Sequence, residues 1–356
     1  MREAISIAMK GKGWTSPNPL VGAVLVKDDQ VVGRGYHARA GAPHAETCVL
    51  QEAGKKAQGA TLYINLEPCC HWGRTPPCTQ ALVKSGIQRI IIGMVDPNPL
   101  VSGKGIEELR RAGIEVEIGL LGEEARRINE TFIKYVATGR PFVTLKAAIS
   151  LDGKIATVSR QSRWITGPRS RLEAHKLRAQ VDAILVGIET VLADDPQLTV
   201  RLKRGSWNNP KRIVVDSALR IPLDAKVLNP PEPETMVATT PKASDETISL
   251  LKEKGIQVLI IPEKEGRVDL IALMEELGRR EITNILVEGG GEVNAAVLQE
   301  RLVDKVVFFI APLLIGGKGA PGAIGGEGFP VLEEAVKLKR IQVKRLDPDI
   351  MIQGYI

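Results

Sequence analysis

The first 121 residues alternate apolar runs with amphipathic stretches, and this alternation predicts strands and helices in turn. Apolar, β-branched runs predict strands at 20–26, 31–38, 60–69, 87–96 and 114–121. Stretches rich in helix-forming residues predict helices at 44–53, 78–86 and 103–113, each ending at or next to a glycine. A polar turn at 27–30 joins the first two strands as a hairpin. Together these elements predict a layered α/β sandwich.

A second series of apolar runs follows a helical link at 122–139 and predicts a larger α/β domain. Its strands are expected at 141–150, 181–187, 211–217, 234–240, 256–262, 282–291 and 303–314, and its helices at 170–180 and 268–280. The domain boundary is expected near 140–145, which divides the chain into residues 1–144 and 145–356. The proline-rich stretch 228–235 is interpreted as a surface loop. The glycine-dense stretch 313–328 is interpreted as a loop that is either near a site or simply exposed.

Length, composition and charge narrow the class of protein. A chain of 356 residues is typical of two domains. Its net charge of +6 suits phosphorylated substrates or a phosphate-rich cofactor, and it is equally ordinary for a soluble enzyme. Aromatic residues make up only 4%, too few for a base-stacking platform, so we expect no nucleic-acid partner. The N-terminus does not resemble a signal peptide and no apolar run is long enough to cross a membrane, so we expect a cytoplasmic protein with no membrane partner.

The cysteines carry the first chemical signal. All four lie in the first 78 residues, and clustered cysteines in such a chain more often bind metal than form disulfides. One imidazole and two thiolates, from His44, Cys69 and Cys78, would complete the protein ligands of a catalytic zinc ion and leave its fourth position for water. Glu46 lies two residues after His44 at a predicted helix start, where its carboxylate can move the proton of that water.

Other donors nearby leave alternatives open. Zinc deaminases usually place two residues between their cysteines, whereas Cys69 and Cys78 enclose eight. Cys70 is a rival ligand by composition, although we interpret it as a packing or loop residue. His71 is interpreted as facing a substrate rather than the metal, and Cys48 as packing on the helix face of His44. The helix that begins at Cys78 is expected to favour the thiolate of that residue.

These residues belong to longer motifs that resemble a known family. The stretches 17–22, 44–46, 66–78 and 96–99 resemble the riboflavin-biosynthesis pyrimidine deaminases, a branch of the cytidine and deoxycytidylate deaminases. The stretches 146–154, 164–167, 194–201 and 287–291 are similar to the partner reductase, whose fold is like that of dihydrofolate reductase. The resemblance covers nearly the whole chain, in the order of the bifunctional family.

The resemblance implies two reactions, one zinc ion and NADPH. The deaminase hydrolyses the 2-amino group of 2,5-diamino-6-(5-phosphoribosylamino)pyrimidin-4-one, and the reductase converts the ribosyl group of the resulting uracil to ribityl. It also implies small-molecule pyrimidine substrates and a homo-oligomer. Zinc should lie on the three residues given above, with Glu46 as the catalytic proton shuttle. Asn18 should hold the pyrimidine, and Arg74 is either a phosphate contact or a solvated loop charge.

For the reductase half, the resemblance implies two sets of contact residues. The NADPH set is Ala148, Trp164, Thr190, Asp194, Ser217, Gly290, Gly291, Glu292, Val293, Asn294, Ala295 and Ala296. The substrate set is Lys146, Ser162, Arg178, Leu198, Arg201 and Glu288.

The residues themselves give a physical reason for part of these sets. A buried strand that runs into Gly289–Gly291 and then a helix start favours phosphate binding, although the spacing is not that of a Rossmann fingerprint. Guanidinium groups bind phosphate bidentately, so Arg178 and Arg201 are either phosphate clamps or ordinary surface charges. Glu288 could bind ribityl hydroxyls or cap the next helix. The proton donor is left open between Lys146, Asp152 and water.

Two rival functions share some of these signals. A deaminase acting on a base within a nucleic acid would use the same zinc site, but it needs a basic or aromatic channel that this sequence does not indicate. A zinc-stabilised binding protein would need no carboxylate at position 46. We therefore expect a bifunctional enzyme.

Overall fold

The computed structural model describes residues 1–72, 76–203, 205–229 and 233–356, which form two compact units. The first unit is Met1–Gly139 and the second is Arg140–Ile356. The division falls a few residues before the boundary expected between 144 and 145, and it leaves the strand that starts at Phe142 in the second unit. None of the helices among the described residues is long and apolar enough to cross a membrane.

The first unit is built on a five-stranded sheet with the order β2-β1-β3-β4-β5. Its strands are β1 (Gly22–Lys27), β2 (Gln30–Tyr36), β3 (Thr61–Leu66), β4 (Arg89–Met94) and β5 (Glu115–Ile118). β1 pairs antiparallel with β2 as the predicted hairpin and also antiparallel with β3, whereas β3, β4 and β5 are parallel. The helices are α1 (Arg2–Ala8), α2 (Ala45–Ala53), α3 (Cys78–Lys84), α4 (Lys104–Arg111), α5 (Gly122–Ile128) and α6 (Glu130–Thr138).

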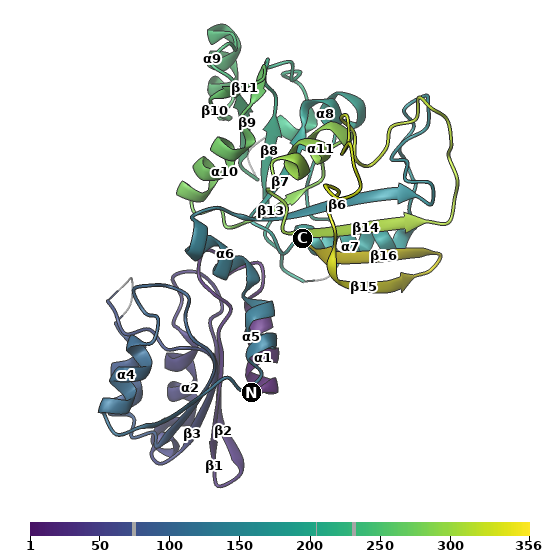
Figure 1. The fold of residues 1–356 in the computed structure, drawn as a ribbon. Helices are drawn as coiled ribbons and strands as arrows, with labels where there is room; N and C mark the ends of the chain where they lie inside the picture. Colours follow the sequence, from purple (N-terminus) through teal and green to yellow (C-terminus); the bar gives the residue numbers. More distant parts are fainter. Residues whose placement is uncertain (73–75, 204, 230–232) are drawn as a thin grey trace. The chain divides into compact units, whose positions relative to one another are not determined.

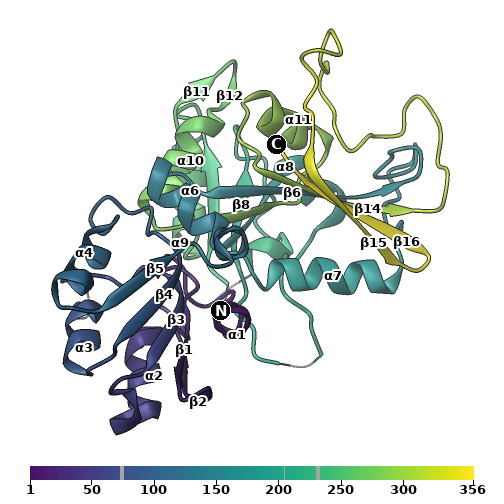
Figure 2. The same ribbon diagram turned by 60° about the horizontal axis from the view of Figure 1, so that its bottom comes forward.

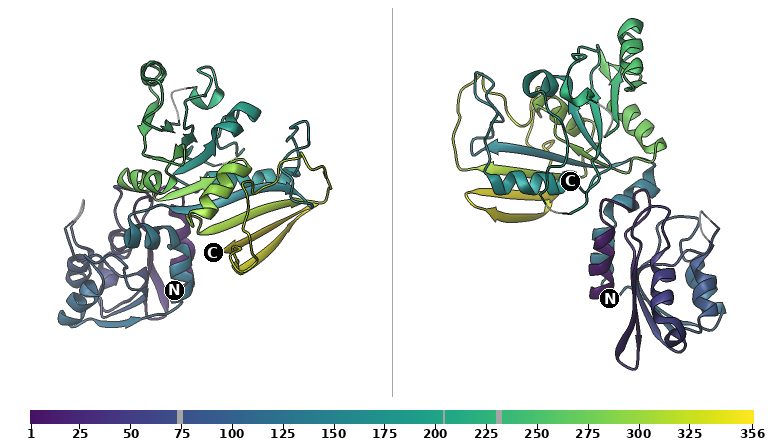
Figure 3. Two further views of the ribbon diagram at one scale, coloured as in Figure 1. Left: turned by 45° about the horizontal axis from the view of Figure 1, so that its top comes forward. Right: turned by 180° about the vertical axis from the view of Figure 1, so that it is seen from behind.

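Helices cover both faces of this sheet, as Figures 1 and 3 show. α1 and α5 lie on one face, and α2, α3 and α4 lie on the other. The close approach of α2 depends on Gly35 in β2, because a Cβ atom there would lie 2.3 Å from the main-chain oxygen of Ala45. This approach fixes the start of α2, where the candidate metal ligand His44 lies.

The second unit contains a nine-stranded sheet with the order β10-β9-β8-β7-β13-β6-β14-β16-β15. Its strands are β6 (Phe142–Ser150), β7 (Ala183–Gly187), β8 (Lys211–Val215), β9 (Thr235–Thr239), β10 (Gln257–Ile260), β13 (Asn284–Val287), β14 (Lys305–Ala311), β15 (Lys339–Leu346) and β16 (Asp349–Tyr355). All neighbours from β10 to β14 are parallel, and β16 and β15 complete one edge antiparallel. A short ribbon, β11 (Glu263–Lys264) and β12 (Arg267–Val268), stands apart from the sheet.

Alternate residues of the central strands pack into two separate cores. In β7, Leu185 belongs to the core beneath α10 (Leu270–Arg279) and α11 (Gly291–Gln299). Its neighbours Ile184 and Val186 belong to the core beneath α8 (Ile188–Asp194) and α9 (Asp245–Glu253). α7 (Pro168–Arg178), which runs alongside the sheet in Figure 2, packs its Leu177 against the same core as α8. A strand buried on both faces reads as a continuous apolar run, which is why the sequence pattern predicts these strands well.

Some elements differ from those expected from sequence. The predicted link 122–139 is two helices, because the buried side chain of Asn129 lies between them and forms hydrogen bonds with the main chain of Leu20 at 2.8 and 3.0 Å. The sequence pattern did not predict α1, α8, α9, β15 or β16. Within the proline-rich stretch 228–235, residues 230–232 lie outside the described part of the chain.

Candidate active sites

Three side chains from separate parts of the first unit meet close to the end of β3. His44 precedes α2, Cys69 follows β3, and Cys78 is the first residue of α3. The Nδ1 atom of His44 lies 3.3 Å from the Sγ atom of Cys78 and 3.7 Å from that of Cys69. A tetrahedral zinc ion with ordinary Zn–N and Zn–S bonds holds such atoms about 3.6 Å apart. Both the donor set and its spacing therefore fit zinc.

The two sulfur atoms have different surroundings. The main-chain N–H of Cys78 donates to the Sγ atom of Cys69 at 3.4 Å. Hydrogen bonding from the Cys78 side chain, opposed by burial and aided by His44, holds the pKa of Cys69 well below its usual range. The start of α3 therefore also supports the thiolate of Cys69, beside the thiolate of Cys78 for which that support was expected from sequence.

Glu46 lies in the first turn of α2, two residues after His44, and its side chain is buried. Burial, together with the negative charge of Cys69, raises the pKa of Glu46 to about 7. A carboxyl group that titrates near neutral pH can both accept and return a proton, which is the property that a proton shuttle needs.

The predicted pyrimidine contact Asn18 is tied to a histidine that the sequence analysis did not single out. The Nδ2 atom of Asn18 donates to Nε2 of His37 at 3.0 Å, and Nδ1 of His37 donates to the main-chain oxygen of Pro43 at 3.1 Å. The ring of His37 packs edge-on against that of His44, with 5.3 Å between centroids. Asn18 is thereby connected to the metal cluster, and no motif spacing in the sequence indicates this connection.

The rival donors stand outside the cluster. Among the described residues, the group of metal-ligating side chains around His44 contains Cys69 and Cys78 alone. Cys48 lies on α2 and donates its main-chain N–H to the oxygen of His44, while Cys70 is partly exposed. Arg74, the predicted phosphate contact, lies outside the described residues.

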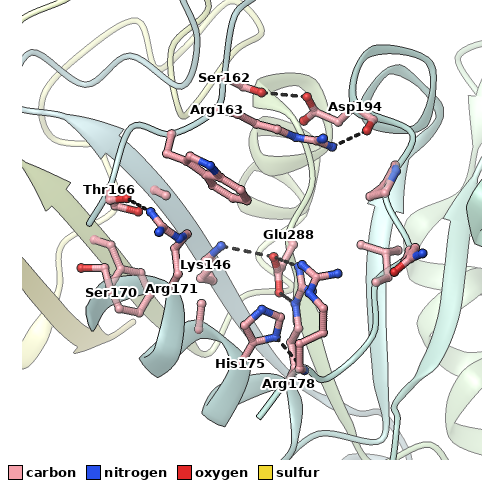
Figure 4. Close-up of a pocket in the computed structure, with 18 of the residues that line it drawn as sticks. Lys146, Ser162, Arg163, Thr166, Ser170, Arg171, His175, Arg178, Asp194 and Glu288 are labelled. Atoms are coloured by element: carbon pink, nitrogen blue, oxygen red, sulfur yellow. Dashed lines mark hydrogen bonds and ion pairs between the residues drawn. The ribbon is translucent and has the colours of Figure 1, made fainter. Parts of the chain in front are cut away.

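The second unit contains a cavity of about 1220 Å³ (Figure 4). Many residues of the two predicted contact sets line it, drawn from β6, α7, α8, the end of β13 and the connecting loops: Lys146, Ala148, Ser162, Trp164, Arg178, Thr190, Asp194, Leu198, Arg201, Glu288 and Gly290. These residues are far apart in the sequence, and the sheet brings them to one place.

An ion-pair network joins three of the predicted substrate residues at this cavity (Figure 4). Nε and Nη2 of Arg178 donate to the two carboxylate oxygens of Glu288 at 2.7 and 3.0 Å, and Nζ of Lys146 donates to the same carboxylate at 3.2 Å. All three side chains are largely buried. Burial would raise the pKa of Glu288, but the charges of Arg178 and Lys146 hold it well below its usual range. Glu288 therefore remains a carboxylate and does not cap the next helix.

At the rim of the cavity, hydrogen bonds join residues 162 and 163 to residue 194, which is distant in the sequence. The Oγ atom of Ser162 donates to Oδ1 of Asp194 at 2.7 Å, and the guanidinium of Arg163 donates to the main-chain oxygen of Asp194 (Figure 4). Trp164 is two-thirds exposed, and its ring lies 4.5 Å from the Cζ atom of Arg171. A predicted substrate residue, Ser162, is thus bonded to a predicted cofactor residue, Asp194.

The remaining predicted cofactor residues do not line the cavity described above. Ser217 accepts a hydrogen bond from the main chain of Val268 at 3.0 Å. Gly291, Glu292, Val293, Asn294, Ala295 and Ala296 form the first turns of α11. The helical period turns Asn294 and Ala295 into the core, where both are buried, so only part of this stretch faces outward. Their role as cofactor contacts stays a prediction.

The glycine-dense loop 313–328 is bonded to the start of α11 and to the turn after β6. Gly325 donates its main-chain N–H to Gly291 at 2.9 Å, and Nδ2 of Asn294 donates to the oxygen of Ala323 at 2.8 Å. Asp152 accepts from the N–H groups of Ile315 and Gly316, and these bonds, after that from Ser150, lower its pKa to about 2. The carboxylate of Asp152 is therefore ionised and holds the loop through these hydrogen bonds. Because it carries no proton at neutral pH, it is a poor proton donor.

Two family models match the chain. Residues 1–94 match the cytidine and deoxycytidylate deaminase zinc-binding region, and residues 141–352 match the RibD C-terminal domain. These matches agree with the α/β fold class expected from sequence, with a cytidine-deaminase-like domain followed by a reductase domain.

Relatives and solved structures are similar over both units. A riboflavin biosynthesis protein RibD of Aquifex aeolicus is 49% identical over 352 residues, covering 99% of this chain and 96% of that protein. The corresponding Escherichia coli protein is 42% identical over 363 residues, covering 99% and 97%. Acinetobacter baumannii RibD, form 1, has a TM-score of 0.90 at 41% identity, covering 99% and 97% of the two chains. A diaminohydroxyphosphoribosylaminopyrimidine deaminase/5-amino-6-(5-phosphoribosylamino)uracil reductase of Thermotoga maritima has a TM-score of 0.87 at 36% identity, covering 100% and 97%.

Proposed function

This chain belongs to the RibD family and is a bifunctional deaminase and reductase of riboflavin biosynthesis, and from that premise we propose that its two units divide the reactions. Residues 1–139 carry the deamination and residues 140–356 carry the reduction. The position of the zinc-binding-region match in the first unit and of the RibD C-terminal match in the second supports this division.

In the deaminase unit, His44, Cys69 and Cys78 hold one zinc ion. A zinc ion held by such ligands lowers the pKa of a bound water to near neutrality. Glu46 takes the proton of the attacking water on its carboxylate and passes it to the departing ammonia. Asn18, fixed by His37, binds the pyrimidine. The substrate is the phosphoribosylated diaminopyrimidine that the name of the Thermotoga maritima relative specifies.

In the reductase unit, the cavity binds the deaminated product and NADPH. Arg178 and Arg201 contact the phosphate of the substrate, and Glu288 and Lys146 contact its ribosyl hydroxyls. Arg178 has five N–H donors, of which three are used within the protein, so donors remain for a ligand. The outward part of the first turn of α11 contacts the cofactor, whose dihydronicotinamide supplies hydride.

The observation that carries the proposal is the meeting of one imidazole and two sulfurs beside a buried carboxylate, in a chain that also holds a cationic cavity. The test is an assay of the purified protein with the phosphoribosylated diaminopyrimidine and NADPH. We expect one zinc per chain, release of ammonia and then oxidation of NADPH. Deamination of RNA but not of the free pyrimidine would contradict the proposal, as would the absence of NADPH oxidation after ammonia release.

The protein is also proposed to form a homo-oligomer through the second unit. β15 is the edge strand of the large sheet, and Ile341 and Val343 on it are more than half exposed. An edge strand with exposed apolar side chains is a surface on which a second strand can pair. Sedimentation of the protein and of an Ile341→Lys, Val343→Lys variant tests this proposal, and identical masses for the two would contradict it.

A further inference from the structure

His175 lines the reductase cavity but belongs to neither predicted contact set. It lies on α7, three residues before Arg178, so the two side chains project from the same face of the helix (Figure 4). Its Nδ1 atom accepts the main-chain N–H of Arg201 at 3.2 Å. This bond links the helix to the loop that carries one of the two proposed phosphate-binding arginines.

Two side chains of α7 hold this loop together. Nη1 of Arg178 donates to the main-chain oxygen of Thr199 at 3.1 Å, and His175 accepts from the N–H two residues later. Arg178 and His175 thus hold two main-chain groups of residues 199–201, and together they fix the main chain from which the side chain of Arg201 projects.

This role requires a neutral imidazole. A main-chain N–H can only donate, so the Nδ1 atom of His175 must carry no proton. The charged groups around the ring are Arg178 on the same helix, Arg201 on the loop, Lys146 on β6 and Glu288 after β13. Three cations against one carboxylate oppose a further positive charge. Burial, followed by Arg178 and Arg201, lowers the pKa of His175 to about 4, so the ring is neutral at neutral pH.

The side chain of Arg201 has no ion pair of its own among the described residues. It lines the cavity near the buried Arg178–Glu288 pair. The main chain fixes the point from which a long side chain starts, and therefore the region that its charged end can reach. The bond to His175 therefore helps to keep the Arg201 guanidinium within reach of a ligand in the cavity.

We propose that His175 is a positioning residue of the reductase site, which holds Arg201 ready for the substrate phosphate by accepting its main-chain N–H. This inference rests on the proposed function, in which Arg201 contacts the phosphate. It assigns to His175 neither contact with the reacting atoms nor a proton transfer. Loss of the bond weakens phosphate binding and leaves the hydride-transfer step unchanged.

The experiment compares the phosphoribosylaminouracil substrate with the same compound lacking its phosphate. For the wild type, KM should be lower for the phosphorylated compound than for the compound without phosphate. The KM of the second divided by the KM of the first, called the phosphate preference below, measures how much binding depends on the phosphate. Replacing His175 by Leu should reduce the phosphate preference about fivefold, which corresponds to the loss of one hydrogen bond, and should leave kcat for the phosphorylated compound unchanged. The Arg201→Ala variant should also have a reduced phosphate preference. The double variant, with both His175→Leu and Arg201→Ala, should show no further reduction, because both changes act through the same side chain.

Two further variants separate positioning from folding. An Asn side chain places its amide oxygen near the position of Nδ1, whereas a Gln side chain places it near Nε2. His175→Asn should therefore keep most of the wild-type phosphate preference, whereas His175→Gln should lose it, although the two variants should have comparable thermal stability. Arg169→Ala, on the same helix and outside the cavity, is the matched control and should keep the wild-type phosphate preference.

The outcomes distinguish this inference from the function on which it rests. A wild type that reduces neither compound overturns the proposed reductase function, and the positioning role falls with it. A wild type that prefers the phosphorylated compound, with a His175→Leu variant of equal preference, overturns the positioning role alone. Additive losses in the double variant, or equal behaviour of His175→Asn and His175→Gln, also overturn it.

Discussion

The Nδ1 atom of His44 lies 3.3 Å from the Sγ atom of Cys78, although the two residues are 34 positions apart in the chain. One is held at the start of α2 and the other at the start of α3, and the sulfur of Cys69 completes the group. Two helix starts that face the end of one strand therefore bring the three candidate ligands together. A catalytic zinc ion has three protein ligands, so each of these three residues should be needed for binding.

Replacing Cys78 by Ala should abolish zinc binding and deamination, because a catalytic zinc site with two protein ligands has lost a charge-neutralising thiolate. NADPH-dependent reduction of the deaminated substrate should persist, since it belongs to the other unit. Metal analysis and separate assays of the two reactions check this. Cys48→Ala is the matched control, because Cys48 lies on α2 outside the cluster, and it should keep its zinc. Equal zinc loss in both variants would argue against the assigned ligand set.

Replacing Glu46 by Gln should leave zinc content unchanged and lower the rate of deamination by about 10²–10⁴-fold, the usual effect of losing a general acid or base. The amide has nearly the same shape as the carboxyl group, but it cannot accept the proton of the attacking water. Zinc analysis with an ammonia assay gives both quantities from one preparation. Normal turnover of the variant would exclude Glu46 as the proton shuttle.

The sequence predicted those parts of the molecule that have a local signature. His44, Glu46, Cys69 and Cys78 carry a motif whose residue types serve metal binding and proton transfer, and the structure brings the three predicted ligands together. The strands of both sheets that are buried on two faces appear as continuous apolar runs and were found for that reason. Arg178 and Glu288 were named from family motifs, and the structure joins them in one ion pair.

Other features depend on contacts between distant residues and leave no local signature. β15 has exposed side chains on nearly every position, so its sequence lacks the apolar pattern of a strand although it pairs with β16. His37 and His175 act through the partners that folding brings to them, Asn18 and the main chain of Arg201. The helical spacing of positions 175 and 178 was visible in the sequence, and it could have placed His175 beside Arg178.

Replacing Glu288 by Gln should destabilise the second unit by about 3–5 kcal/mol, because it leaves Arg178 and Lys146 buried without their counter-charge. Glu189→Gln is the matched control. Glu189 pairs with Arg220 at the surface, both side chains are more than half exposed, and such pairs contribute about 0–1 kcal/mol. Chemical denaturation of the full chain, followed through the transition of the second unit, compares the two. Similar losses would mean that the buried network does not stabilise the unit.

The stability of the second unit should fall in acid through His175. Its pKa is about 4 in the folded protein and about 6.5 in an unfolded chain, so the unfolded state binds more protons between these values. Stability therefore decreases as the pH falls from about 6.5 to about 4 and is insensitive to this group above about 7.

His175→Asn keeps an acceptor for the N–H of Arg201 and cannot titrate. The thermal midpoint of the wild type minus that of His175→Asn should thus fall steadily over this interval. All other titrating groups, including the buried His37, are common to both proteins and cancel in the difference. A difference that stays constant from neutral pH to about pH 4 would show that the folded protein accommodates a charged ring at this position.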